Sequence, residues 1–417
     1  MPESNPKAGS EERGVGAWQL LRHHPAFRSL CSARVISFIG DSVSLVALML
    51  HVAGTTGQAL AVSLLLLAGD FAPSLLSPLT GAVSDRFNLK RVMITCELVQ
   101  GALLVLIALA LPPLPLLLLL VAARAVAGQV FLPASRAAVP ALVHGRDLEA
   151  ANSTLGFGTN VAEALGPLMA AALFPLVGVR GVLLVDAASF LVSAAVLTSL
   201  PSLPSASAGE EDPPSLLDQA KTGLGYIRSA PAVRVIALGS CAVVAFNGID
   251  DVALVLLATE TFGAGGSAVG LLLGAVGIGL LFGYGLLARY HARASMAALL
   301  LFGFAVSSAG NLLTGLSWAV AAAFAMQTVR GVGIAAMDVA TNTMLQRLVP
   351  PGMLGRVFGN LYGAIGVAAA LSYVGGGLLL DATSAPVTFL IAGAGGTLAT
   401  LAVALALPGA LRKTPSA

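Results

Sequence analysis

The chain has 417 residues, of which 57% are hydrophobic and only 10% are charged, and its mean hydropathy is +0.90. This composition excludes an ordinary water-soluble protein, whose charged share is about 25%. The apolar stretches are continuous rather than alternating, which excludes a barrel of the outer-membrane type. At ~20 residues per membrane span, the length allows about twelve helical spans with their connections.

Twelve apolar segments follow one another along the chain, and each is long enough to cross a bilayer as an α-helix. We expect the first six near 27–53, 57–82, 92–111, 114–140, 154–177 and 180–200. We expect the second six near 233–257, 266–288, 294–315, 317–345, 356–380 and 386–408. The sequence therefore predicts an all-α polytopic membrane protein with twelve transmembrane helices.

Three further segments are too polar to cross the membrane. Residues 1–26 hold several charges and no apolar core, so we expect a cytoplasmic segment and no cleavable signal peptide. Residues 201–231 form a linker that is rich in Pro and Ser at its start and amphipathic over 215–229, which predicts a short helix on the membrane surface. Residues 409–417 form a cytoplasmic tail.

Lys and Arg residues gather in alternate connections between the predicted spans. They occupy the N-terminal segment, the 83–91 and 136–146 loops, the 201–234 segment and the tail, whereas the opposite connections hold one cation, Arg180. Cytoplasmic loops of membrane proteins carry the excess of Lys and Arg. We therefore expect both termini in the cytoplasm and the chain in the cytoplasmic (inner) membrane.

A short charged loop between the second and third spans reads Gly81-Ala-Val-Ser-Asp85-Arg86-Phe-Asn-Leu-Lys90-Arg91. Its pattern, G-x-x-x-D-R-x-x-x-[KR]-R, resembles the signature loop of the major facilitator superfamily of transporters. The resemblance covers nearly the whole chain and implies two pseudo-symmetric six-helix bundles, 27–200 and 232–408. It also implies that Gly81, Asp85, Arg86, Lys90 and Arg91 form a conformational latch.

The two halves of the chain echo each other at an offset of about 204 to 208 residues. The run that begins at Arg124 in the fourth span matches the run that begins at Arg330 in the tenth. The segment 38–41 in the first span resembles the segment 246–250 in the seventh. The common offset indicates a duplicated six-span unit, which is the parallel-repeat plan of facilitator transporters.

Charges inside the membrane cost about 2.5–3.5 kcal/mol each at the bilayer centre, so each one suggests a function. In the facilitator architecture, spans 1, 4, 7 and 10 line the central cavity, and most of the intramembrane charges of this chain lie on those spans. We expect the proton-coupling and substrate cavity to use Arg34, Asp41, Arg124, Glu163, Asp250, Asp251, Arg330 and Asp338.

Structural interpretations of these charges remain open as well. Two pairs of opposite charge are candidates for ion pairs between helices, Arg34 with Asp41 and Arg330 with Asp338. Glu97 lies near the cytoplasmic end of span 3, where we expect it to pair with a loop cation. Asp186 in span 6 is compatible with polar packing between helices.

The fifth span contains Gly166-Pro167 within a run of small residues, which bends a helix and lets it pack closely. This resembles the Gly/Pro-rich fifth-helix motif of facilitator antiporters, although alanine stands at three positions where that motif prefers glycine. Arg124 occupies the position of a fourth-helix arginine that is thought to aid proton transfer in such antiporters. The resemblance therefore implies the exporter branch, which includes macrolide, multidrug and siderophore efflux proteins.

We expect a secondary active transporter that exports a small amphipathic molecule, such as a drug, macrolide or siderophore, by proton-coupled antiport. Two bundles would rock about a central site, with Asp41 as the first candidate proton carrier and Asp250 or Asp251 as the next. In the outward-open state, Asp85 and Arg86 would latch the cytoplasmic ends. The alternative is a proton-independent facilitator or a lysophospholipid transporter, in which the charges are structural.

Other classes of function find no support in the sequence. No cluster of His, Asp or Cys gathers at either membrane interface and no phosphate-binding loop is present, so we expect neither an enzyme nor an ATP-driven pump. The three cysteines lack metal-ligand spacing, so we expect no disulfide, metal or cofactor. The expected partners are a small-molecule substrate, protons and membrane lipid but no nucleic acid, and the expected state is a monomer.

Overall fold

The computed structural model describes residues 17–71, 87–143, 147–203, 216–290, 295–350 and 353–413. Within these ranges the chain is almost entirely helical and contains no β-strand. Ten of the helices in the described part are long and apolar enough to cross a membrane. The predicted all-α polytopic membrane fold is confirmed.

The described part of the N-terminal half contains seven helical elements. They are α1 (Ala17–His23), α2 (Pro25–Thr56), α3 (Ala59–Leu66), η1 (Leu67–Phe71), α6 (Leu89–Ala110), α7 (Leu114–Leu142) and α8 (Leu148–Thr198). The expected span 57–82 is described as α3 and the π-helical turn η1, and residues 72–86 lie outside the described part. Helix α8 runs through the two expected spans 154–177 and 180–200, which are separated at Gly178, where φ is +62°.

Nine helical elements lie in the described residues of the C-terminal half. They are α9 (Leu216–Ser229), α10 (Pro231–Asn247), α11 (Asp250–Leu256), η3 (Leu257–Thr261), α12 (Gly266–Tyr290), α13 (Met296–Gly315), α14 (Val320–Leu348), α15 (Leu354–Ala382) and α16 (Ala385–Lys413). The seventh expected span, 233–257, is interrupted between α10 and α11. Asp250 and Asp251 therefore lie in the first turn of α11, where the partial positive charge of a helix N-terminus favours carboxylates.

Local chemistry explains where several helices begin and end. Asn88 caps the start of α6, because its Oδ1 atom accepts a hydrogen bond of 3.2 Å from the Arg91 backbone N–H. The Lys90 ammonium group donates to the backbone oxygens of Thr198 and Leu200, at 2.7 and 2.6 Å. A cation on the last carbonyls of a helix is favourable. Lys90 thus ties the start of α6 to the end of α8.

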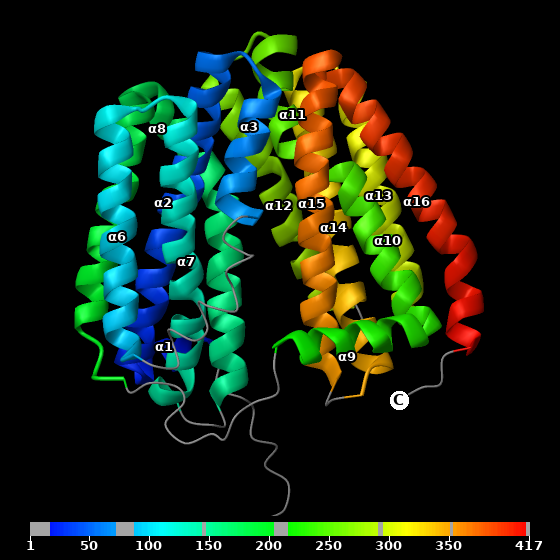
Figure 1. Cartoon of the computed structure of the whole chain (residues 1–417), viewed down its shortest axis with the longest axis horizontal. Helices are drawn as coiled ribbons and strands as arrows, with labels where there is room; N and C mark the ends of the chain where they lie inside the picture. Colours follow the sequence, from blue (N-terminus) through cyan, green and yellow to red (C-terminus); the bar gives the residue numbers. More distant parts are fainter. Residues whose placement is uncertain are drawn as a thin grey trace, which may run out of the picture.

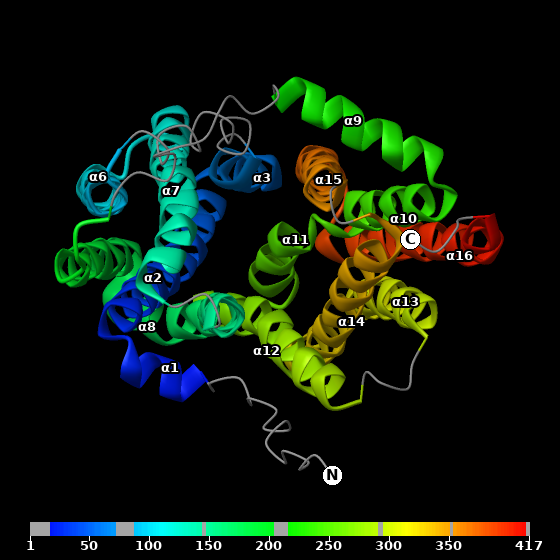
Figure 2. The same cartoon turned by 90° about the horizontal axis from the view of Figure 1, so that it is seen from below.

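The helices form two bundles that stand side by side (Figure 1). The bundle of the N-terminal half contains α2, α3, α6, α7 and α8, and the bundle of the C-terminal half contains α10 to α16 (Figure 2). We call the end of the molecule that carries α1, α9 and the C-terminal end of α16 the basal end (Figure 1). We call the opposite end, where α2 connects to α3 and α15 connects to α16, the distal end.

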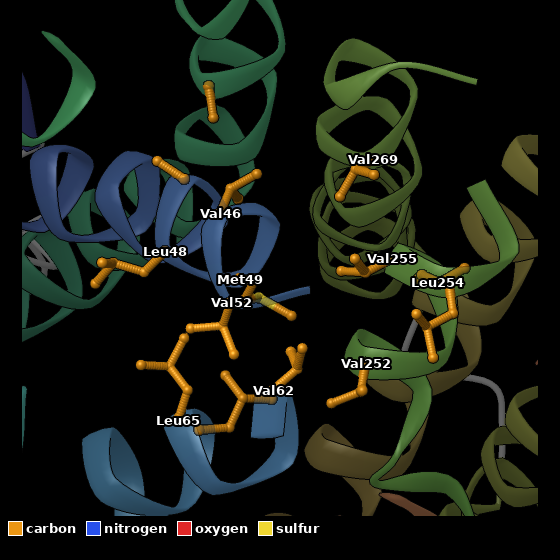
Figure 3. Close-up of a cluster of buried hydrophobic side chains, with 14 of the residues drawn as sticks. Val46, Leu48, Met49, Val52, Val62, Leu65, Val252, Leu254, Val255 and Val269 are labelled. Carbon is orange, nitrogen blue, oxygen red and sulfur yellow. The ribbon is translucent and has the colours of Figure 1, made fainter. Parts of the chain in front are cut away.

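The bundles are joined mainly toward the distal end. A buried apolar cluster there combines Val46, Met49 and Val62 of the first bundle with Val252 and Val255 of the second (Figure 3). Nearer the basal end, the apolar clusters each belong to one bundle alone. We call the apolar cluster to which both bundles contribute the distal cluster. Burial of apolar surface therefore holds the two halves together at one end.

Glycines let α12 of the second bundle approach α8 of the first. Gly270, Gly274 and Gly277 face α8, where a β-carbon at Gly270 would lie 2.5 Å from the Pro167 backbone oxygen and one at Gly277 would lie 2.5 Å from the Ala164 Cα atom. These contacts are closer than any side chain tolerates. The small-residue packing expected for the fifth span is thus matched by small residues on α12.

We expect Gly270→Ala to lower the free energy of unfolding by about 1–3 kcal/mol relative to Gly285→Ala, because the added methyl group forces α12 away from α8. Gly285 lies on the same helix, and a β-carbon there would meet nothing within 4 Å. Both changes carry the same gain in helix propensity. The check is thermal unfolding of both purified variants in detergent, and equal unfolding temperatures would contradict the proposed close packing.

Candidate functional site

An ion pair lies at the middle of the N-terminal bundle. Arg124 of α7 donates through its Nη1 atom to the carboxylate of Asp41, which lies half-way along α2. The same Nη1 atom lies 4.0 Å from Oδ2 of Asp186, a fully buried residue of α8. The Asp186 Oδ1 atom accepts a 3.1 Å hydrogen bond from the Ser189 hydroxyl. One guanidinium group is therefore placed between two carboxyl groups from different helices.

A cavity of about 410 Å³ adjoins this ion pair. Its wall includes Asp41 and Arg124, and 35% of the Asp41 side chain is exposed, so small molecules and water can reach the carboxylate. The other polar lining residues are Ser37, Ser42, Glu97, Gln100 and Gln129, and the aromatic ones are Phe38, Phe131 and Phe190. All the lining residues belong to the N-terminal bundle. The cavity thus combines charge, amides and aromatic rings, which suits an amphipathic ligand.

Glu97 belongs to this cavity, which corrects the expectation that it pairs with a loop cation. Its side chain is 1% exposed, and its Oε2 atom accepts no hydrogen bond from the described residues. A buried carboxyl oxygen without a donor is costly and marks a place where a ligand or a proton can be accommodated. The sequence did hold a signal, because Glu97 and Gln100 are three residues apart and share one face of an otherwise apolar helix.

A second ion pair lies in the C-terminal bundle. Arg330 of α14 pairs with Asp250 at the start of α11, and both side chains are at least nine-tenths buried. The Arg330 Nη1 atom also donates to the Gln327 side-chain oxygen at 3.2 Å. Gln327 in turn donates to Asn311 and to the Thr314 hydroxyl, and Asn311 donates to Asn247 at 3.0 Å. Neutral amides and hydroxyls therefore fix this pair from one side.

The two ion pairs occupy equivalent places in the repeat. Arg330 follows Arg124 by 206 residues, and Asp250 follows Asp41 by 209. Their surroundings differ, because the first pair faces a cavity and a second carboxyl group, whereas the second pair is buried against an amide network. The N-terminal pair is therefore open to a cavity, whereas the C-terminal pair is enclosed by protein groups.

The structural pairings considered for Arg34 and Asp338 do not form. Arg34 donates to the Ser135 hydroxyl at 3.3 Å and lies over the Phe38 ring, 5.3 Å from its centroid. Asp338 accepts hydrogen bonds from the Tyr284 hydroxyl at 3.0 Å and from the Asn342 amide at 2.9 Å. The reason is geometric, because seven or eight residues along one helix separate each pair by more than ~10 Å. Asp41 instead pairs with Arg124 of α7, and Asp338 is bound by Tyr284 of α12 and by Asn342 of its own helix.

The other predicted site residues have varied positions. Asp251 is half-buried on α11. Gly166 faces Ser42 of α2 so closely that a β-carbon would overlap the serine side chain, and Pro167 follows within α8. The side chain of Glu163 and the loop residues Gly81, Asp85 and Arg86 lie outside the described part of the chain. Within the described residues, no group of three or more His, Cys, Asp or Glu could hold a metal ion.

Comparisons with known proteins place these features in a family. One family profile, that of the Major Facilitator Superfamily, matches residues 30–250, which is more than half of the chain. An uncharacterized MFS-type transporter of Bacillus subtilis (strain 168), YfiS, is 25% identical over 386 residues, covering 90% of this chain and 91% of that protein.

Solved transporter structures share the fold at low identity. The nucleoside transporter NupG superposes with a TM-score of 0.76 at 12% identity, over 91% of this chain and 98% of that chain. A bacterial homologue of the human lysosomal transporter Spinster, in an inward-facing and unoccupied conformation, superposes with a TM-score of 0.69 at 16% identity, over 93% and 95%. The chain belongs to the major facilitator superfamily and is a multi-pass membrane transporter.

Proposed function

We propose that this transporter exports a small amphipathic molecule in exchange for protons, and that Asp41 carries the proton. The observation that supports the proposal is the guanidinium of Arg124, placed between the carboxyl groups of Asp41 and Asp186 beside the cavity. A buried carboxylate needs a nearby cation or donor. One guanidinium serves two carboxylates poorly, so a proton on either of them relieves the imbalance.

The same imbalance supplies a mechanism of coupling. When substrate with a positive or donor group approaches Asp41, it takes the place of a proton on the carboxyl groups around Arg124. When the substrate leaves, a proton returns. Two ligands that compete for one charge site exchange with each other, and that exchange is the requirement for antiport. One proton that moves down ~100 mV releases about 2.3 kcal/mol, which supports a substrate gradient of about fiftyfold.

The charge distribution supports an orientation of the molecule in the membrane. Lys and Arg residues lie at the basal ends of the helices, including Lys90, Arg91, Arg356 and Arg412, whereas Arg180 lies near the distal break in α8. By the positive-inside rule the basal end is cytoplasmic. Because the bundles are joined toward the distal end, this arrangement corresponds to the cytoplasm-facing state of a rocker-switch transporter. Substrate would enter the cavity from the cytoplasm or from the inner leaflet.

The cavity also supports a chemical class of substrate. Glu97 offers an unoccupied acceptor oxygen, and Phe38, Phe131 and Phe190 offer apolar faces. A compound with a protonated amine and an apolar body matches both, since charge-assisted hydrogen bonds are strong where water is excluded.

The cytoplasmic latch belongs to the outward-facing state. Lys90, which already binds the end of α8, acts there as part of the latch with Gly81, Asp85, Arg86 and Arg91.

The alternative is a proton-independent facilitator or lysophospholipid transporter. The observation that favours it is the Arg330–Asp250 pair, because a buried ion pair fixed by amides has a structural role in this same chain. In that case the Asp41–Arg124 pair would be structural too. Substrate movement without any proton flux would distinguish this alternative.

We expect Asp41→Asn to abolish substrate-driven proton movement, since the amide cannot carry the proton, while the protein remains folded. The measurement is internal pH in proteoliposomes during addition of lipophilic amines, macrolides and other amphipathic compounds. Asp250→Asn serves as the matched control. It should retain substrate-driven proton movement and instead lower stability by about 3–5 kcal/mol, because it leaves the Arg330 charge buried without a counter-charge.

These two variants show which of the two ion pairs carries the proton. Full coupled export by Asp41→Asn would contradict the assignment of Asp41 as the proton carrier. Loss of coupling in Asp250→Asn, with unchanged thermal unfolding, would move the proton to the C-terminal bundle.

We expect Glu97→Gln to weaken binding of a lipophilic amine about tenfold, by the ~1.4 kcal/mol of one lost charge-assisted hydrogen bond. Binding of a neutral analogue with the same apolar body should change little, because its contacts with the aromatic rings remain. Calorimetric titration of purified protein with both compounds measures the contrast. Equal losses for both compounds would show that Glu97 shapes the cavity rather than recognises the amine.

A further inference from the structure

A carboxylate of one bundle caps a helix of the other at the distal end. Asp381 lies in the last turn of α15, and α3 begins at Ala59. The Ala59 backbone N–H donates to Asp381 Oδ1 at 2.6 Å, and the Leu60 backbone N–H donates to Asp381 Oδ2 at 3.1 Å. Both oxygens of one carboxylate are therefore bound by consecutive N–H groups of a helix that lies 321 residues away in sequence.

This contact takes the place of a cap that α3 lacks. The first N–H groups of a helix have no partner within that helix, and a side chain at the preceding position normally accepts from them. Gln58 occupies that position and makes no side-chain cap hydrogen bond. Asp381 supplies the missing acceptor and also places a negative charge at the positive end of the helix dipole. The start of α3 is thus completed by the opposite bundle.

The helices approach closely below the cap as well. Gly377 lies one turn before Asp381 on α15, and a β-carbon there would lie 2.5 Å from the Ser63 hydroxyl oxygen and 3.1 Å from the Leu60 Cα atom. Leu380 of the same turn is buried in the distal cluster. Glycine and aspartate, four residues apart, therefore share one face of α15 and fit the first turns of α3.

We propose that Asp381 is a distal latch, a residue that holds the two bundles together at the distal end. The inference rests on the alternating access proposed above, in which the distal ends separate when the transporter faces outward. Separation would break both hydrogen bonds at once and remove the dipole contact. Water, which already reaches the exposed Asp381 residue, would then take the place of the two N–H groups, so the latch biases the equilibrium between the two states rather than blocking it.

The test is a measurement of distances between spin labels in the absence of substrate and of a pH gradient. Two labelled proteins are made, both with the native cysteines replaced by serine. One carries distal labels at Ala110→Cys and Leu316→Cys, and the other carries basal labels at Ala141→Cys and Arg412→Cys. Each labelled position is exposed at the end of a helix. The fractions of protein with the short and with the long distal distance give the closed and open populations, and their ratio is the measured quantity.

We expect Asp381→Ala to lower the ratio of distal-closed to distal-open protein about tenfold, a shift of ~1.4 kcal/mol, with the opposite change at the basal labels. Thr383→Ala is the matched control. Thr383 is exposed at the same helix end, and its hydroxyl donates only within α15, to the Leu379 backbone oxygen. That variant should leave the ratio unchanged.

A second variant separates a latch from a simple cap. Gln58→Asp combined with Asp381→Ala gives α3 a cap within its own bundle but restores no link between bundles. A ratio that stays shifted in this double variant supports the latch. A ratio that returns to the wild-type value means that fraying of α3 caused the shift, and it overturns the proposal.

An unchanged ratio in Asp381→Ala also overturns the proposal. Because no proton or substrate gradient is present, these outcomes do not depend on whether transport is coupled to protons. An experiment can therefore contradict the latch without contradicting the proposed antiport, and the reverse.

Discussion

A charge buried among membrane-spanning helices must find a counter-charge or donor, and the rest of this structure follows from how that requirement is met. Arg124 meets it by drawing Asp41 from α2 and Asp186 from α8 toward α7. Three helices are thereby fixed around one guanidinium group, and the cavity lies beside it. In the second bundle, Arg330 meets the same requirement with one carboxylate and a network of amides. The two repeats thus place an equivalent ion pair in different surroundings, one beside a cavity and one among amides.

Closure of the distal end has a different physical basis. Apolar side chains of both bundles form the distal cluster, glycines on α12 admit α8, and Asp381 caps α3 from across the interface. The apolar contacts are non-directional, whereas the carboxylate contact exists only in one arrangement of the bundles. Helix α2 joins the two regions, since it carries Asp41 at its middle and Val46 and Met49 in the distal cluster. The ion pair and the distal cluster therefore share one helix.

Partners of charged residues were the hardest feature to predict. The offset between the two halves identified Arg124 and Arg330 correctly as equivalent positions, yet the acids that pair with them come from other helices. A sequence reports spacing along one helix, and the distance between helices depends on how they pack. Glu97 shows the same limit, because its place near the cytoplasmic end of span 3 suggested pairing with a loop cation, whereas in the structure it lines the cavity.

The sequence by itself determined the fold class, since continuous apolar runs of ~20 residues can only be satisfied by helices in a membrane. The pattern of the loop over residues 81–91 indicated the family. It also identified the intramembrane charges, because their cost makes them rare. Only the tertiary structure decided which of those charges meet, that Glu97 lines the cavity, and that Asp381 completes a helix of the other bundle. These facts depend on distances between segments hundreds of residues apart, and such distances arise from packing rather than from local pattern.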